Sequence, residues 1–293
     1  MDNLSAETKG YLLAFVGVVI FALTLPVTRW IVNADGSHAL SPTFVTVARA
    51  TIAGLCGLAY LWWQKALRFP RGLVAAILVS ALGTVLAFPY FLGMGLAQAP
   101  SIQAAVVTGF MPICTAVFTS LYFRQTQTWL FWVCALLGFL LVLAFSLYQG
   151  LGVIKAADIF LVLAVMTGAI GYVAGIKVSS AMPASHAISW VLVFSLPLTL
   201  PCTLWLWPTQ GINVSNSIGM LYLGVFSMWL GFFAWYKGLV LGGAMRVSQV
   251  QLLQPFVALM LSAILLGERL DLSVLVFAGA LILTVFASKR AAR

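Results

Sequence analysis

Apolar runs long enough to cross a bilayer follow one another along almost the whole chain. A helix needs about 20 residues to cross the hydrocarbon core of a membrane. Runs of that order, joined by short connections, lie at 10–32, 41–63, 72–95, 102–123, 129–147, 157–177, 187–207, 218–240, 247–266 and 271–288. Only 7% of the 293 residues are charged, against roughly 25% in soluble domains. The sequence therefore predicts an all-α integral membrane protein with ten transmembrane helices.

The composition also excludes other classes of partner. The net charge of +9 comes from Lys and Arg residues scattered singly between apolar runs, so no basic face for nucleic acid is expected. All four cysteines lie inside apolar runs and lack a metal-like spacing, which predicts buried free thiols and no metal site. We expect no cofactor, and the predicted partners are a small-molecule solute and the lipid bilayer. The sequence leaves the oligomeric state open, and a monomer is compatible with it.

The distribution of Lys and Arg predicts the orientation, because cytoplasmic connections carry an excess of these residues. With the N-terminus inside, the inner segments hold Lys9, Lys65, Arg68, Arg71, Arg124, Lys177, Arg246, Lys289, Arg290 and Arg293. The outer segments then hold only Lys155 and Arg269. We therefore predict a multi-pass plasma membrane protein, of a bacterial inner membrane, with both termini in the cytoplasm.

The two halves of the chain match at an offset of 143 residues. Gly95–Leu96, Val107 and Pro112 correspond at this offset to Gly238–Leu239, Val250 and Pro255. This predicts two five-helix repeats, residues 1–147 and 148–293. Because five is odd, the second repeat threads the membrane in the opposite direction. Inverted repeats typically place a substrate site near the midplane and alternate access to it by rocking against each other.

The motifs of the second half resemble those of the drug/metabolite transporter superfamily, in particular its paired EamA-type domains. They are Trp235–Tyr236–Lys237–Gly238–Leu239, Gln254–Pro255, Leu266–Gly267–Glu268–Arg269–Leu270 and Gly279. The first half keeps the frame in Gly95–Leu96, Met111–Pro112 and Gly138, but it reads Phe123–Arg124–Gln125–Thr126 where the second half has the Gly–Glu–Arg turn. The resemblance implies a transporter that exports amino acids, other metabolites or drugs. The most similar type is the aromatic amino acid and paraquat exporters, although no substrate-specific motif distinguishes it.

Arg49 is the candidate residue for substrate recognition. It lies eight residues beyond Ser41, and so about 12 Å below the predicted outer surface at 1.5 Å per residue. A guanidinium at that depth usually faces a cavity or a partner, and its planar fork suits a substrate carboxylate. The alternative is an arginine bonded to carbonyls at a helix end. The carboxylates and histidines all lie near span ends, so facilitated transport or exchange is favoured over proton coupling.

Aromatic and amide side chains form two further candidate faces. Trp229, Phe233 and Tyr236 share one face of the eighth span at α-helical spacing, and Tyr90 corresponds to Phe233 in the repeat. They line a substrate cavity or simply pack between helices. Gln251 and Gln254 share a face of the ninth span and correspond to Thr108 and Met111. A glutamine facing lipid would leave its amide unsatisfied, so both are expected to contact either substrate or other helices.

Prolines and glycines predict how the spans bend and pack. We expect Pro26, Pro89, Pro112, Pro197 and Pro255 to kink their helices, because each lacks a backbone N–H, and to help form or gate a cavity. The glycines Gly168, Gly171 and Gly175 form one face of the sixth span, which favours close approach of a neighbouring helix.

Two other functional classes remain as alternatives to a transporter. An intramembrane enzyme acting on a lipid-like substrate would need paired acids, a histidine cluster or a nucleophile with its base, and the sequence has no such catalytic arrangement. A non-transporting scaffold needs no site at all, but an inverted repeat argues against it. The sequence thus predicts a transporter rather than an enzyme.

Overall fold

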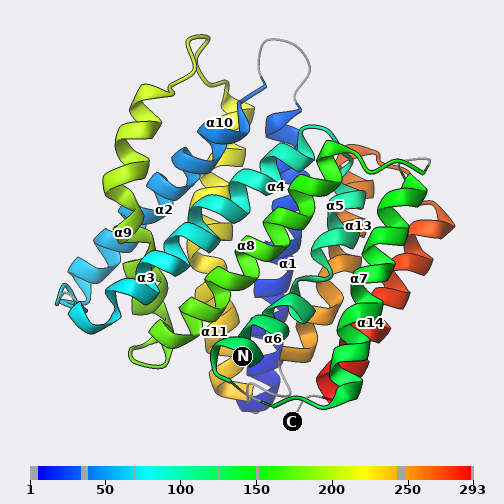
Figure 1. The fold of residues 1–293 in the computed structure, drawn as a ribbon. Helices are drawn as coiled ribbons and strands as arrows, with labels where there is room; N and C mark the ends of the chain where they lie inside the picture. Colours follow the sequence, from blue (N-terminus) through cyan, green and yellow to red (C-terminus); the bar gives the residue numbers. More distant parts are fainter. Residues whose placement is uncertain are drawn as a thin grey trace.

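A computed structural model describes residues 6–33, 39–68, 70–124, 126–149, 152–242 and 248–291 of the chain, and every regular element in these ranges is helical. Six apolar runs form uninterrupted helices (Figure 1). They are α1 (Ala6–Val32), α2 (Pro42–Trp63), α7 (Trp129–Gln149), α8 (Ala156–Ser179), α9 (Ala184–Trp205) and α14 (Leu272–Ala291). The all-helical fold predicted from the sequence is confirmed.

The other four runs each contain a change of helix type or a break. The third consists of η2 (Arg71–Leu73), α3 (Val74–Ser80), a π-helical segment η3 (Ala81–Ala87) and α4 (Phe88–Leu96). The fourth consists of α5 (Ser101–Thr108) and α6 (Met111–Tyr122). The eighth consists of α10 (Val214–Leu221), a second π-helical segment η4 (Tyr222–Leu230) and α11 (Gly231–Gly242). The ninth consists of a 3-10 segment η5 (Ser248–Leu253) and α13 (Gln254–Leu266).

Several helix ends follow from local chemistry. Ser41 accepts a hydrogen bond from the Phe44 backbone N–H (3.2 Å) just before α2, and Pro42 occupies the first helical position. Asn213 accepts one from the Asn216 backbone N–H (2.7 Å) at the start of α10. These contacts satisfy donors that a helix N-terminus leaves free. At the other end of α13, Gly267 adopts a left-handed conformation (φ +65°), which glycine accommodates without strain.

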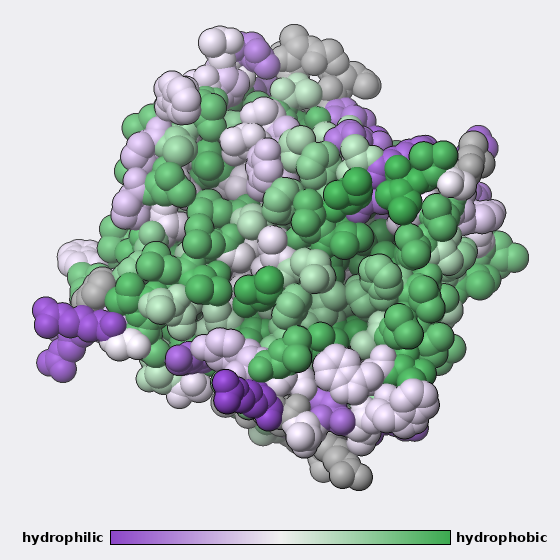
Figure 2. Space-filling view, viewed as in Figure 1, coloured by the Kyte–Doolittle hydropathy of each residue, from purple (hydrophilic) through white to green (hydrophobic). Residues whose placement is uncertain are grey.

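The helices suit a membrane in length and surface. Eight helical stretches are long and apolar enough to cross one, and Gln254–Leu266 and Leu272–Ser288 are shorter apolar helices. Hydrophobic residues cover the middle of the face in Figure 2, while hydrophilic residues gather toward its ends. Tryptophans at helix ends are highly exposed, including Trp63 (74%), Trp129 (79%) and Trp205 (85%). Such residues are enriched at the two interfaces of a bilayer.

Helices of the two halves pack against each other in matching pairs. Helix α1 of the first half lies along α11 and α13 of the second half. Helix α8 of the second half lies along α3, α4 and α6 of the first half. The other two main pairings also join the halves: α2 packs along α9, and α7 along α14 (Figure 1). Each half therefore completes the packing of the other.

The predicted glycine face of α8 brings η3 and α4 close. A Cβ added to Gly171 would lie 2.6 Å from the Thr84 backbone nitrogen, and one added to Gly168 would lie 2.9 Å from the Phe88 ring. On the facing segment, a Cβ at Gly83 would lie 2.6 Å from Gly171 Cα and 2.7 Å from the Thr167 carbonyl oxygen. The close approach expected from the glycine spacing is confirmed, and at Gly171 and Gly83 it is made by backbone against backbone.

Substituting Gly83 tests this contact. In Gly83→Ala the new methyl group overlaps main-chain atoms that cannot rotate away, so the free energy of unfolding is expected to fall by about 1–3 kcal/mol. Gly279→Ala is the matched control, since nothing lies within 4 Å of a Cβ there. Thermal denaturation of the detergent-solubilised variants provides the comparison. Equal melting temperatures for the two variants would contradict the packing described here.

Candidate functional site

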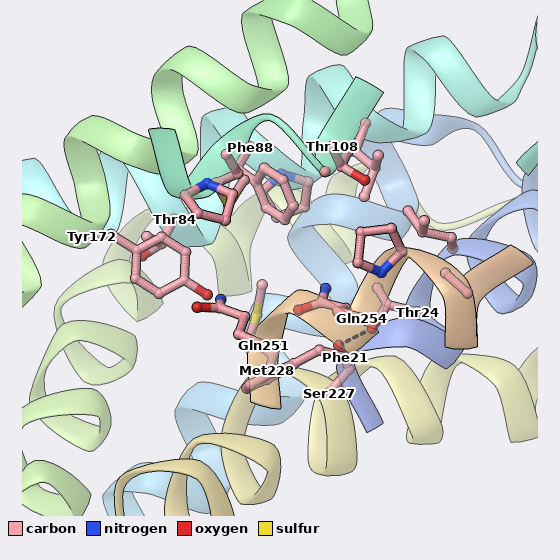
Figure 3. Close-up of a pocket in the computed structure, with 18 of the residues that line it drawn as sticks. Phe21, Thr24, Thr84, Phe88, Thr108, Tyr172, Ser227, Met228, Gln251 and Gln254 are labelled. Carbon is pink, nitrogen blue, oxygen red and sulfur yellow. Dashed lines mark hydrogen bonds between the residues drawn. The ribbon is translucent and has the colours of Figure 1, made fainter. Parts of the chain in front are cut away.

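A cavity lies among helices of both halves, with about 1020 Å³ of empty space including the part open to solvent. Its first-half lining comes from α1, α2, η3, α4 and the α5–α6 break: Phe21, Thr24, Leu25, Arg49, Thr84, Phe88, Pro89, Leu92, Thr108, Gly109, Met111 and Pro112. Its second-half lining comes from α8, η4, α11, η5, α13 and α14: Tyr172, Ser227, Met228, Phe232, Gln251, Gln254, Pro255, Ala258, Ile282 and Val285. Figure 3 shows how these side chains surround the space. The site is therefore shared between the halves.

Arg49 is the cationic residue of the described lining. Its side chain is only 3% exposed, and Nη2 donates to Ser227 Oγ at 3.1 Å. Ser227 Oγ also lies 2.7 Å from Thr24 Oγ1, a contact drawn in Figure 3. The Arg49 Nε has no hydrogen-bond partner among the described residues, and none of these forms an ion pair with the guanidinium. A buried guanidinium with spare donors is the chemistry that binds a carboxylate.

The sequence around Ser227 explains how it reaches Arg49. Gly224 lies where η4 crosses α2, and a Cβ there would lie 2.7 Å from Ile52 Cγ2 and 3.1 Å from the Arg49 carbonyl oxygen. The absent side chain lets the two helices approach closely. Ser227, one turn further along η4, is thereby within hydrogen-bond distance of Arg49.

Four of the residues predicted to bind substrate lie together in this cavity. Arg49, Thr108, Gln251 and Gln254 all contribute to its lining. In Figure 3 the Gln254 amide lies beside Thr24, while Gln251 is nearer Tyr172. The Thr108 hydroxyl donates to the Ala104 carbonyl (2.7 Å) of its own helix, so it faces the cavity with acceptor capacity only.

The structure does not place the predicted aromatic face at the cavity. Trp229 donates through Nε1 to Ser189 Oγ (3.2 Å), and its ring and that of Phe233 pack with Tyr60. Trp229 and Phe233 do share a face, since their ring centroids lie 5.0 Å apart, but that face is turned toward Tyr60 rather than the cavity. In this part of the chain the cavity is lined by Ser227, Met228 and Phe232.

Of two related residues, Tyr90 falls outside the cavity lining. Tyr90, chosen as the repeat partner of Phe233, packs its ring against Phe91 with centroids 5.4 Å apart. Tyr236 belongs to α11, but its side chain lies outside the described residues.

The five predicted kink prolines fall into two groups. Pro89, Pro112 and Pro255 stand in the first turns of α4, α6 and α13, where helices resume after a π segment, a break or a 3-10 segment, and all three line the cavity. Pro26 and Pro197 lie inside the uninterrupted helices α1 and α9. Only the first group marks changes of helix type.

The comparisons with known proteins bear on the whole chain. The model of the EamA-like transporter family matches twice, over residues 8–147 and 155–288. The chain belongs to the EamA-like transporter family. The uncharacterized transporter YdeK of Bacillus subtilis (strain 168) is 36% identical over 293 residues, covering 99% of this chain and all of YdeK. A crystal structure with 19% sequence identity covers 94% of this chain and 98% of its own with a TM-score of 0.62, which supports the fold alone.

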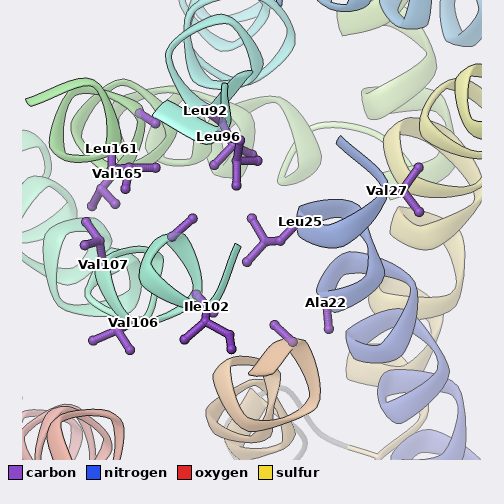
Figure 4. Close-up of a cluster of buried hydrophobic side chains, with 14 of the residues drawn as sticks. Ala22, Leu25, Val27, Leu92, Leu96, Ile102, Val106, Val107, Leu161 and Val165 are labelled. Atoms are coloured by element: carbon purple, nitrogen blue, oxygen red, sulfur yellow. The ribbon is translucent and has the colours of Figure 1, made fainter. Parts of the chain in front are cut away.

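One end of this EamA-like transporter is sealed beyond the cavity. The lining stops at Leu25 on α1, Leu92 on α4 and Ala258 on α13, and all three also belong to a buried apolar cluster. The cluster continues toward the helix ends through Leu96 and Ile102, as Figure 4 shows around Leu25 and Leu92. Apolar packing therefore separates the cavity from this end of the bundle.

Polar contacts join the halves at the same end. Glu268, just after α13, accepts hydrogen bonds from the backbone N–H groups of Ser101 and Ile102, each at 2.8 Å. Within the first half, Arg29 on α1 donates to the Leu96 carbonyl oxygen. A carboxylate on the N-terminus of α5 complements both the free N–H groups and the helix dipole. We call this contact of Glu268 with α5 the end latch.

The end latch predicts a role for Glu268 in stability. In Glu268→Gln the amide has one acceptor oxygen instead of two and no charge, so the free energy of unfolding should fall by about 1–3 kcal/mol. Asp271→Asn neutralises an exposed carboxylate of the same connection whose side chain has no hydrogen bond among the described residues. Denaturant titration in detergent measures both variants. A stable Glu268→Gln protein, indistinguishable from the control, would rule out an energetic contribution of the latch.

Proposed function

We propose that this membrane transporter exports a small metabolite, an amino acid or drug-like solute, that binds through a carboxylate in the cavity. Ten transmembrane helices form two inverted repeats, residues 1–147 and 148–293, whose rocking alternates access to the cavity. The single observation that carries the proposal is a buried Arg49 without an ion-pair partner among the described residues, in a cavity shared by both halves. A charged side chain at membrane depth is costly and is a functional-site candidate by default.

The local features of the helices support the repeat. The π segment η3 (Ala81–Ala87), shifted by 143 residues, falls within η4 (Tyr222–Leu230). The start of α6 at Met111 likewise falls on the start of α13 at Gln254. The helix pairs also match between the halves. The first span of each half, α1 or α8, lies along the third span of the opposite half. Two similar halves that pack in this exchanged way can rock against each other.

The charges of the site favour transport without a buried proton carrier. None of the described lining residues is Asp, Glu or His, whereas proton-coupled carriers usually hold a titratable acid or histidine in their pathway. We therefore expect facilitated diffusion or exchange down the solute's own gradient. With both termini in the cytoplasm of a bacterial inner membrane, the end sealed by the latch faces outward, and the latch opens when solute is released.

Counterflow in liposomes tests the proposal. Purified protein in vesicles preloaded with an unlabelled carboxylate solute, an amino acid or an organic acid, is expected to accumulate the corresponding labelled solute. Arg49→Ala should lower that uptake about tenfold or more, because it removes the charged partner of a desolvated carboxylate.

Arg269→Ala is the matched control, because Arg269 is exposed in the connection after α13. It should transport like the parent protein. Both variants are compared after gel filtration and thermal denaturation establish that they fold. Unchanged uptake by a folded Arg49→Ala protein would remove Arg49 from the site, and absence of uptake for every solute would count against transport itself.

A further inference from the structure

The cavity has an unbalanced set of charges. Its described lining contains Arg49 and no carboxylate. The remaining polar side chains are neutral hydroxyls and amides: Thr24, Thr84, Thr108, Tyr172, Ser227, Gln251 and Gln254. Some hydroxyl protons are already engaged, since Thr84 donates to the Ser80 carbonyl (2.7 Å). A solute held at Arg49 therefore meets one fixed positive charge and neutral dipoles.

Two carboxylates near the cavity end, Glu268 and Asp158, lie outside the lining and have other partners. Glu268 forms the end latch with the N-terminus of α5. Asp158 accepts hydrogen bonds from the Gln103 amide (2.6 Å) and from the Lys155 backbone N–H (3.0 Å). Both lie near the sealed end, and neither belongs to the cavity lining.

We infer that, among the carboxylate solutes of the proposed function, on which this inference rests, the cavity prefers an arylalkyl monocarboxylate without an amino group to an amino acid. A monoanion compensates the charge of Arg49. The ammonium of an amino acid, bonded to the carbon next to its carboxylate, would lie close to the guanidinium with only neutral acceptors around it. Burying a charge without a counter-ion is unfavourable. A cation would face Arg49 directly and is excluded.

Aromatic side chains provide the site for the body of such a solute. Phe21, Phe88, Tyr172 and Phe232 come from four different elements of the two halves. In Figure 3, Phe88 and Tyr172 lie on one side of the cavity and Phe21 on the other, close to the Thr24–Ser227 contact. An aromatic ring can pack between these faces while its carboxylate reaches Arg49 beside Ser227.

Four ligands with the same phenyl ring and a similar chain separate the effects of charge. They are 3-phenylpropanoate (anion), phenylalanine (zwitterion), 3-phenylpropanamide (neutral) and 3-phenylpropylamine (cation). Titration calorimetry on the full-length protein in nanodiscs at about pH 7, where these charge states hold, measures each affinity. We expect 3-phenylpropanoate to bind about tenfold or more tightly than phenylalanine, because the ammonium of phenylalanine is buried without a counter-ion. We expect 3-phenylpropylamine not to bind.

Arg49→Gln identifies the residue responsible. Its affinity for 3-phenylpropanoate should fall about tenfold or more, while its affinity for the neutral amide stays within about twofold, which shows that the cavity is intact. Arg49→Lys keeps the positive charge, so it should still bind the anion 3-phenylpropanoate more tightly than the zwitterion phenylalanine. Arg269→Gln, at an exposed position, should bind all four ligands like the parent protein.

The outcomes separate this inference from the proposed function. Phenylalanine binding as tightly as 3-phenylpropanoate, or an anion preference that survives Arg49→Gln, would overturn the inference. Failure of all four ligands to bind would overturn it as well. In each case, counterflow of any other solute would leave the proposed transport function standing.

Discussion

Inside a bilayer every backbone N–H and C=O group must find its partner within the protein, and this constraint governs the whole bundle. An uninterrupted α-helix meets it without help, as six of the helices here do. A change of helix type frees or displaces hydrogen bonds and is tolerated where protein groups or a wet cavity receive them. The four interrupted spans all contribute to the cavity, through residues such as Thr84, Pro112, Ser227 and Pro255. The irregular backbone therefore lies along the cavity, where uninterrupted helices add further lining residues such as Arg49.

The helical spans were predictable from sequence because hydropathy reports directly on length and on lipid exposure. The observed helices begin and end within about four residues of the apolar runs, as expected for single-sequence boundaries. The small-residue face of α8 was equally readable, since Gly168 and Gly171 have no other role in an apolar helix than close packing. Hydropathy and glycine spacing can be read from sequence because they depend only on residues close together in the chain and on the α-helical period of 3.6 residues per turn.

The site was only partly predictable, for two physical reasons. Arg49, Gln251 and Gln254 were found because an unsatisfied charge or amide in lipid is costly, so their mere presence indicates a protected environment. Thr24 and Ser227 carry no such signal, because a hydroxyl in a membrane helix can bond to its own backbone. The spacing of Trp229 and Phe233 correctly indicates a shared face, but it does not indicate whether that face meets the cavity or Tyr60. The repeat offset of 143 residues relates Thr84 to Ser227, and both residues line the cavity.

The two halves share a backbone frame but not their charges, and this difference assigns them different roles. At the repeat offset of 143 residues, the position of Arg49 is occupied in the second half by Leu192, which is fully buried. A symmetric pair of arginines would place two like charges in one low-dielectric cavity, at a high electrostatic cost. One guanidinium avoids that repulsion and gives the solute a single orientation. In the proposed mechanism, the similar frames provide the means of rocking, and recognition comes from the side chains in which the halves differ.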